Sequence, residues 1–285
     1  MTAASLLILT TLDGISAAKP SSGCGNAPMI VTSSSTTTAL TVKVNGKNRD
    51  YYVKLPDNYD KNHPYRLIYT LHALSGTASQ VIAGTGGYLP WYGLPPLSND
   101  NISAIYVAPN GINKGWANQG GEDITFISQL NQILDADLCI DQNLRFSTGF
   151  SYGAAMSFSI GCSLAKDFRA VAVLSGNPII SGCAGGNDPI AYYAQHGVGD
   201  AILPISDARV MRDRFLKNNG CAVQTASEPA TGSGKHVKTS YTGCSKDYPV
   251  TWVAFDGGHS PQPMDSGMSS TYANTETWEF FSQFT

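Results

Sequence analysis

Charged side chains are scarce in this sequence. Lys, Arg, Asp and Glu make up 14% of the 285 residues, and the formal net charge is −3 at pH 7. This balance offers little attraction for a polyanion, so we expect no nucleic-acid partner and a neutral polar ligand instead. The N-terminal apolar run, residues 6–12, is too short to cross a bilayer, so we expect no membrane partner. A chain of this length can fold alone, and we expect a monomer.

Small residues at positions 16–18 follow the short apolar run, which is the pattern of a signal-peptidase site. The basic residues that usually open a secretory signal are missing, and Asp13 is unusual in one. An ordinary N-terminus therefore stays an alternative. We expect residues 1–18 to be a cleaved secretory signal and the protein to be extracellular.

The sequence has no CxxC pair and no histidine at metal-ligand spacing, so its six cysteines favour three disulfides over a zinc site. Fifteen connectivities are possible, and the sequence alone does not fix one. Asn101, in the sequon NIS, lies in a polar stretch and is a predicted glycosylation site. For the disulfides we favour Cys139 with Cys162, Cys221 with Cys244 and, by elimination, Cys24 with Cys183.

Six apolar runs are near-continuous rather than alternating, as expected for strands covered by helices on both faces of a parallel sheet. Earlier in the chain, residues 39–44 and 49–55 alternate around the turn NGKN, which predicts a β-hairpin. The six continuous runs are RLIYTLH (66–72), SAIYVAP (103–109), LRFSTGF (144–150), AVAVLSG (170–176), AYYAQHG (191–197) and VTWVAFDGGH (250–259).

Helix-like stretches lie between these runs. The clearest, residues 121–138, carries apolar side chains at spacings of three and four. Ser206 is placed to cap a second helix, which continues through Leu216. We expect a last helix in the segment that includes Trp278. This alternation predicts one α/β domain with a doubly wound, mostly parallel sheet and no internal repeat.

Residues 149–153, Gly-Phe-Ser-Tyr-Gly, match the pattern GxSxG of a nucleophile elbow. The match alone is weak, but it directly follows a predicted strand and precedes a small-residue helix start, which is the setting that an elbow requires. Glycines are needed because a Cβ at either flank would collide with the neighbouring strand or helix. We predict Ser151 as a nucleophile; an ordinary serine in a glycine turn is the alternative.

A serine hydroxyl needs a base, and in the chain order of such folds the base follows the nucleophile and the acid. His259 is the one late histidine at the end of a predicted strand. His196 lies one strand earlier, and His236 lies in a Gly/Ser/Lys stretch that we expect to be solvated. His63 and His72 come too early in the chain.

Asp200 is our predicted acid, because it follows a predicted strand and precedes a helix, at the same sheet edge as the serine. Its expected work is to fix the tautomer of the histidine and to stabilise the imidazolium. Asp247 is the main alternative, while Asp256 is too close in sequence to His259 to face it.

The oxyanion hole of such a site takes one amide from the residue after the nucleophile and one from the loop after an earlier strand. Tyr152 supplies the first. Ala73 or Leu74 supplies the second, with Gly76 allowing the tight path of the loop, and we expect His72 to have a structural role only. Each donor is typically worth about 3 kcal/mol of transition-state stabilisation.

Several motifs occur in order from about residue 23 to the end: LHALSGTASQ, APNGINKGWANQGGEDITF, CIDQNLRFSTGFSYGAAMSF, GNPIISGC and AYYAQHGVGDAILPI. In these the chain resembles the fungal feruloyl esterases of type B/C, a carbohydrate esterase group that includes acetylxylan esterases. The resemblance implies one α/β-hydrolase domain over residues 19–285, with the triad on Ser151, Asp200 and His259. We expect no carbohydrate-binding module, although some relatives carry one.

The resemblance also implies a substrate and a mechanism. The substrate is a feruloylated plant cell-wall polysaccharide or oligosaccharide, from which ester-linked ferulate or p-coumarate is released. The reaction is acyl transfer through an acyl-enzyme, with no metal or organic cofactor. Trp91, Tyr92 and Trp116 follow predicted strands, and they are candidates to stack on a cinnamoyl ring or a sugar. Packing inside the protein is their alternative role.

Three other functions remain open from the sequence. Acetylxylan esterase activity would use the same triad with a smaller acyl pocket. A lipid or polyester hydrolase would need a broad, exposed apolar mouth, whereas the loops here are rich in Gly, Tyr and Trp. A catalytically silent binding domain would carry a broken triad, and the intact trio argues against it.

Overall fold

The structure is a computed structural model that describes residues 17–32, 38–99 and 102–285. Within these residues, nine strands form one sheet in the order β1-β2-β4-β3-β5-β6-β7-β9-β8. The strands are β1 (Leu40–Val44), β2 (Lys47–Lys54), β3 (Tyr65–Leu71), β4 (Ala104–Pro109), β5 (Ile140–Phe150), β6 (Ala170–Leu174), β7 (Ala191–Gly197), β8 (His236–Ser240) and β9 (Val250–Phe255).

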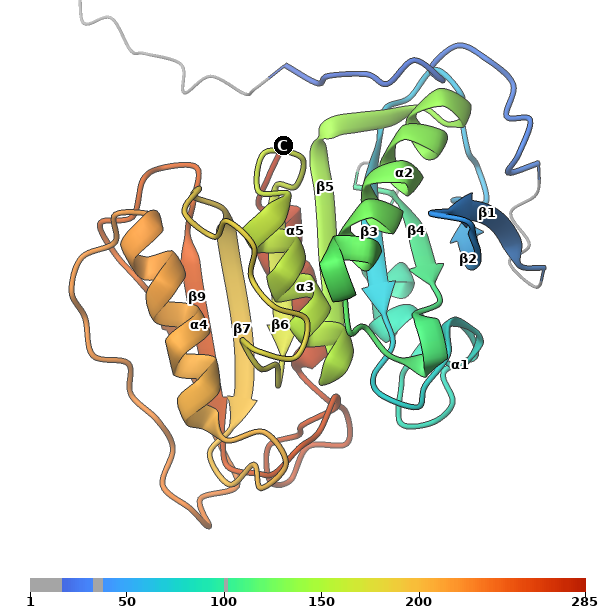
Figure 1. The fold of residues 1–285 in the computed structure, drawn as a ribbon. Helices are drawn as coiled ribbons and strands as arrows, with labels where there is room; N and C mark the ends of the chain where they lie inside the picture. Colours follow the sequence, from blue (N-terminus) through green and yellow to red (C-terminus); the bar gives the residue numbers. More distant parts are fainter. Residues whose placement is uncertain (1–16, 33–37, 100–101) are drawn as a thin grey trace, which may run out of the picture.

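The six central strands, from β4 to β9 in the sheet order, run parallel, and β2 and β8 pair antiparallel with their outer members. Helices cover both faces, with α2, α3 and α4 in front of the sheet in Figure 1 and α5 behind it. The helices are α1 (Ala78–Ala83), α2 (Glu122–Asp137), α3 (Tyr152–Ser163), α4 (Ile205–Asn218) and α5 (Ala273–Ser282), with short 3₁₀ turns at Pro90–Gly93, Pro95–Leu97, Ile112–Lys114 and Gln119–Gly121.

Both faces of the sheet are buried, which explains the continuous apolar runs. Along β3, Leu67 and Tyr69 point into the core under α2, α3 and α4, while Ile68 between them points into the core on the α5 side. A strand with side chains in two cores has no polar face, so its sequence does not alternate. The α/β-hydrolase fold expected from the sequence is confirmed, including the hairpin β1–β2.

Three details of the secondary structure differ from the prediction. Helix α4 begins at Ile205 after Pro204 without a side-chain cap, so Ser206 already lies inside the helix. His236 lies on the edge strand β8 rather than in a solvated loop. The short helix α1, with Thr77 as its capping residue, was not predicted. Short or edge elements bury few side chains, and their sequence pattern is correspondingly weak.

All six cysteines are paired, but two of the three expected pairings are wrong. Cys221 bonds Cys244 as predicted, whereas Cys24 bonds Cys139 and Cys162 bonds Cys183. Residues 20–24 lie along the start of β5, where the Ser21 amide donates to the Ile140 carbonyl. This contact brings Cys24 to Cys139. Cys162, at the end of α3, therefore bonds Cys183 in the loop before β7. Spacing could not reveal it, because the contact joins segments more than a hundred residues apart.

Two expectations concern residues outside the described part of the chain. The expected signal covers residues 1–18, of which 1–16 are not described, and the glycosylation site Asn101 is not described either. Across the residues that the structure does describe, no helix combines the length and the apolar character needed to cross a membrane.

Candidate active site

The turn between β5 and α3 has the shape that the GxSxG pattern predicts. Ser151 has φ 55° and ψ −113°, a conformation that an L-residue adopts only under strain. Its amide donates to the Leu174 carbonyl at 3.0 Å, which ties the turn to β6. A Cβ at Gly149 would lie 2.5 Å from the carbonyl of Gly153, and one at Gly153 would lie 2.2 Å from the Leu71 oxygen. Both glycines are therefore required by close backbone approach.

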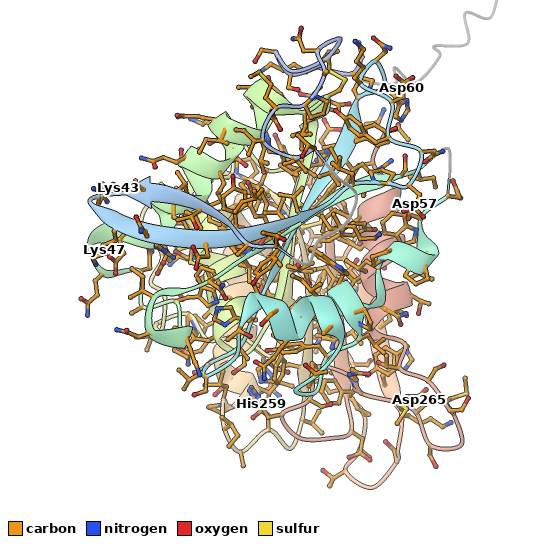
Figure 2. All side chains as sticks on the ribbon, turned by 90° about the vertical axis from the view of Figure 1, so that its right-hand side faces the viewer. Lys43, Lys47, Asp57, Asp60, His259 and Asp265 are labelled. Atoms are coloured by element: carbon orange, nitrogen blue, oxygen red, sulfur yellow. A yellow bond between two sulfur atoms is a disulfide. The ribbon has the colours of Figure 1, made fainter. Side chains whose placement is uncertain are left out.

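His259 and Asp200 meet at the carboxyl edge of the sheet. Figure 2 shows His259 at the lower end of the molecule, the end toward which the arrowheads of the central strands point in Figure 1. The His259 Nδ1 lies 2.6 Å from Asp200 Oδ2. The His259 ring also packs on the ring of Phe150, the neighbour of Ser151, with centroids 4.5 Å apart. The histidine thus contacts both the carboxylate and the elbow.

Asp200 is held in its ionised form. Its side chain is fully buried, and burial alone raises the pKa of a carboxyl group. Hydrogen bonds from His196 and His259, and from the amides of Leu203 and Ile202, outweigh this and hold the pKa of Asp200 below its usual value. An ionised carboxylate at His259 Nδ1 keeps the proton on that nitrogen and leaves Nε2 free to accept one.

The alternative acids and bases lie elsewhere. His236 Nδ1 pairs with Asp265 at 2.9 Å, away from the elbow. Asp247 is exposed and lies 3.7 Å from Arg169, and Asp256 accepts the Gly234 amide. His196 also contacts the Asp200 carboxylate, at 3.3 Å, but among these candidates only His259 pairs with it at 2.6 Å and packs on Phe150 of the elbow.

The loop after β3 is held so that one amide is free. His72 Nε2 accepts the Gly111 amide, so its proton lies on Nδ1, which donates to the Ala73 carbonyl at 2.8 Å. The Gly76 amide donates to the same carbonyl, and the Ala73 amide itself donates to the Tyr88 hydroxyl at 2.8 Å. In a trans peptide the N–H points opposite to the carbonyl, so the Leu74 amide points away from these partners.

Leu74 is therefore the better candidate of the two loop donors. Its amide has no hydrogen-bond partner within the described part of the chain, whereas that of Ala73 is engaged. The Tyr152 amide is the other candidate, since it lies in the first turn of α3, where helical N–H groups lack an intrahelical acceptor. The contact of Gly153 with the Leu71 and His72 carbonyls brings the loop and the elbow side by side.

The three aromatic residues expected at the substrate are buried, which does not fit a stacking role. Trp116 is fully buried, and its Nε1 donates to the His72 carbonyl. Tyr92 donates its hydroxyl proton to the Leu71 carbonyl and accepts the Phe150 amide. Trp91 packs on the ring of Tyr106. Trp116 and Tyr92 brace the ends of β3 and β5, and Tyr92 also lines a small pocket with Pro261 and Gln262 of the loop that carries His259.

The sequence did not identify two residues of this region. Tyr88 holds the Ala73 amide, and His196 contacts the carboxylate of Asp200. Tyr88 reaches the site by packing between separate loops, whereas His196 lies on β7 only four residues before Asp200 and was set aside because it precedes the last strand. His72, expected to be structural, binds the loop carbonyl through a ring whose pKa burial lowers to about 4.

A mostly parallel sheet with helices on both faces, and a strained serine between a central strand and its helix, define an α/β-hydrolase. A solved acetyl xylan esterase from Aspergillus awamori shares this fold, with a TM-score of 0.60 and 16% identity over 86% of this chain and 99% of that one. No protein-family model matches the chain.

Curated relatives are much more similar in sequence. Feruloyl esterase D of Neurospora crassa is 50% identical over 98% of this chain and 96% of its own length. Feruloyl esterase C of Emericella nidulans is 46% identical over 92% of this chain and 90% of its own length. The chain belongs to the feruloyl esterase C/D family, and it is a carboxylic ester hydrolase.

Proposed function

We propose that the protein is a secreted serine esterase that releases ferulate and related hydroxycinnamates from plant cell-wall arabinoxylan. The observation that carries the proposal is the 2.6 Å hydrogen bond between His259 and Asp200, at the sheet edge where Ser151 forms the elbow. Secretion is supported by the signal-like N-terminus and by three disulfides, which persist in oxidising compartments.

The hydrogen bond between His259 and Asp200 supports an acyl-transfer mechanism with Ser151 as the nucleophile. With its Nδ1 proton donated to Asp200, His259 accepts the proton of Ser151 through Nε2 as the serine oxygen attacks the ester carbonyl. The amides of Tyr152 and Leu74 bind the developing oxyanion. His259 then gives the proton to the sugar oxygen as the bond between that oxygen and the carbonyl carbon breaks, and the sugar leaves as an alcohol. Water, activated by the same histidine, attacks the acyl-enzyme and releases the hydroxycinnamate.

Exposed aliphatic side chains support an aromatic acyl group. Leu74, Ile179, Ile202 and Met264 are 63%, 80%, 69% and 55% exposed. They lie in the loops after β3, β6, β7 and β9, which follow the carboxyl ends of parallel strands. An aromatic ring gains more from such contacts than an acetyl group does, because it buries more apolar area. Relatives named feruloyl esterases support the same choice.

The test compares three esters. We expect higher kcat/KM for methyl ferulate than for 4-nitrophenyl acetate, and little turnover of 4-nitrophenyl palmitate. Turnover of acetate with inert ferulate would reassign the protein as an acetyl esterase, and preference for the palmitate ester would reassign it as a lipid hydrolase.

The second test removes the nucleophile. Ser151→Ala should lower kcat on a feruloylated arabinoxylan fragment by about four orders of magnitude or more. Ser163→Ala, at the other end of α3, is the matched control and should retain wild-type rates. Ferulate release by Ser151→Ala near the wild-type rate would rule out the serine mechanism.

A further inference from the structure

We propose that His196 is a positioning residue of the triad: its Nε2 proton, bonded to the Leu203 carbonyl, also faces the Asp200 carboxylate and so limits how strongly that carboxylate holds the proton of His259. The inference rests on the proposed function, since it assigns Asp200 and His259 the roles of acid and base. It adds a fourth side chain, one that touches neither the substrate nor the serine.

The position of His196 leaves its ring one way to donate. The side chain lies on β7 and is fully buried, as is that of Asp200. Its Nε2 lies 2.7 Å from the Leu203 carbonyl and 3.3 Å from Asp200 Oδ2. Both atoms are acceptors, so Nε2 carries the proton. Its Nδ1 is buried without a hydrogen-bond partner among the described residues, so that nitrogen has no acceptor for a proton.

His196 completes the set of donors around the carboxylate. Asp200 Oδ1 accepts the amides of Ile202 and Leu203, both at 2.9 Å. Oδ2 accepts His259 Nδ1 at 2.6 Å and faces His196 at 3.3 Å. The two amides and His259 take three of the roughly four lone-pair positions of the carboxylate, and the proton that His196 shares with Leu203 lies beside the remaining one. Leu203 also joins His196 to the loop, since its amide binds Asp200 and its carbonyl binds the His196 ring.

A second imidazole beside Asp200 Oδ2 should weaken the interaction between that oxygen and protonated His259. A donor to Oδ2 takes up part of the negative charge that would otherwise stabilise an imidazolium at position 259. The titratable side chains in contact with Asp200, among the residues described, are these two histidines. Loss of His196 should therefore raise the pH at which His259 takes up its second proton.

The experiment uses three variants with methyl ferulate as substrate. His196→Leu removes the donor and keeps an apolar group of similar size in the buried site. His196→Gln keeps an N–H donor at about the position of Nε2 but cannot titrate. His236→Leu is the control, because it breaks a His–carboxylate contact, with Asp265, that does not involve Asp200.

We expect His196→Leu to lower kcat/KM about 3- to 10-fold, less than the loss of a full charge-assisted hydrogen bond, because Asp200 is the longer of the two acceptors of the His196 proton. The acid limb of its pH profile, which reports the protonation of the base, should move up by about half a pH unit or more. His196→Gln should recover most of both effects, and His236→Leu should leave the limb unmoved. A slower His196→Leu enzyme with an unmoved limb, or a limb moved down, would overturn the proposal.

Two NMR measurements test the same contact without relying on turnover. In the wild-type protein, imidazole ¹⁵N shifts should show His196 protonated at Nε2 and bare at Nδ1, and the reverse tautomer would overturn the proposal even if His196→Leu fails to fold. The His259 ring should also titrate at higher pH in His196→Leu than in the wild type. If the wild-type protein hydrolyses no ester, the proposed function fails, while these measurements still decide the contact.

Discussion

Two groups of hydrogen bonds flank Ser151, and they are built around different groups. On the β3 side, His72 and Tyr88 hold the peptide groups of the loop, through the Ala73 carbonyl and amide. On the side of β7 and β9, the donors converge on the carboxylate of Asp200. The hydrogen bonds on the β3 side orient the peptide group between Ala73 and Leu74. Those on the Asp200 side stabilise a negative charge. This predicts that changes on the Asp200 side affect proton transfer and changes on the β3 side affect charge stabilisation.

The largest effect should follow from neutralising the charge on the Asp200 side. Asp200→Asn keeps the shape of the side chain but presents an N–H group or an uncharged oxygen to His259 Nδ1. We expect kcat on methyl ferulate to fall about 10⁴-fold, as it does when the same change is made in a serine protease triad. Asp247→Asn, on an exposed residue that pairs with Arg169, should retain wild-type kcat. A loss below about tenfold would remove Asp200 from the mechanism.

His72 and Asp200, one from each group, should lose their contributions to the stability of the folded protein in different pH ranges. Burial lowers the pKa of His72 from 6.5 to about 4, so the folded protein binds this proton more weakly than the unfolded chain does. Its contribution is therefore complete above pH 6.5 and is lost as the pH falls toward 4, up to about 3 kcal/mol. The pKa of Asp200 is instead lowered from 3.8, so its contribution is lost only below that pH.

Urea unfolding at several pH values can separate these ranges. The free energy of unfolding should decline between pH 6.5 and 4 in the wild-type protein, and less steeply in His72→Gln. Asp200→Asn should keep the decline above pH 4 and lose part of the further decline below it. Equal slopes for wild type and His72→Gln would show that His72 is not the group that titrates.

On the β3 side, Tyr88→Phe removes the acceptor of the Ala73 amide and leaves the ring in place. The peptide before the Leu74 amide then loses one of its fixed points. We expect kcat to fall by about tenfold with KM nearly unchanged, because an oxyanion donor acts mainly in the transition state. Tyr52→Phe, on β2, is the control. A rise in KM at constant kcat would place Tyr88 in substrate binding instead.

The same comparison shows what the sequence could and could not predict. The central strands and the elbow were predictable because their signals are local: continuous apolar runs, and glycines around Ser151. Asp200 and His259 could be selected because each follows a strand of a parallel sheet, and their contact agrees with that choice. Their catalytic roles stay predictions until the variants are measured.

What was missed depends on packing between distant segments. Nothing in the local sequence around Trp116 distinguishes a ring that stacks on a ligand from one that is fully buried beneath His72. The pairing of Cys24 with Cys139 depends on where residues 20–24 lie. His196 is close to Asp200 in sequence, but whether its ring faces the carboxylate depends on how the loop after β7 folds back onto its own strand. Such contacts follow from the fold and leave no spacing rule in the sequence.

The smallest effect should come from the exposed aliphatic side chains. It tests whether residues on the Asp200 side also contact the acyl group of the substrate. Ile202 has its amide on Asp200 and its side chain 69% exposed, so Ile202→Ser removes apolar area and keeps the backbone bond. We expect kcat/KM for methyl ferulate to fall about three- to tenfold, the value of part of one aliphatic side chain, with 4-nitrophenyl acetate unaffected. Val223→Ser, on a fully exposed residue after α4, should change neither rate. Equal losses on both esters would mean that Ile202 acts through Asp200 and not through the acyl ring.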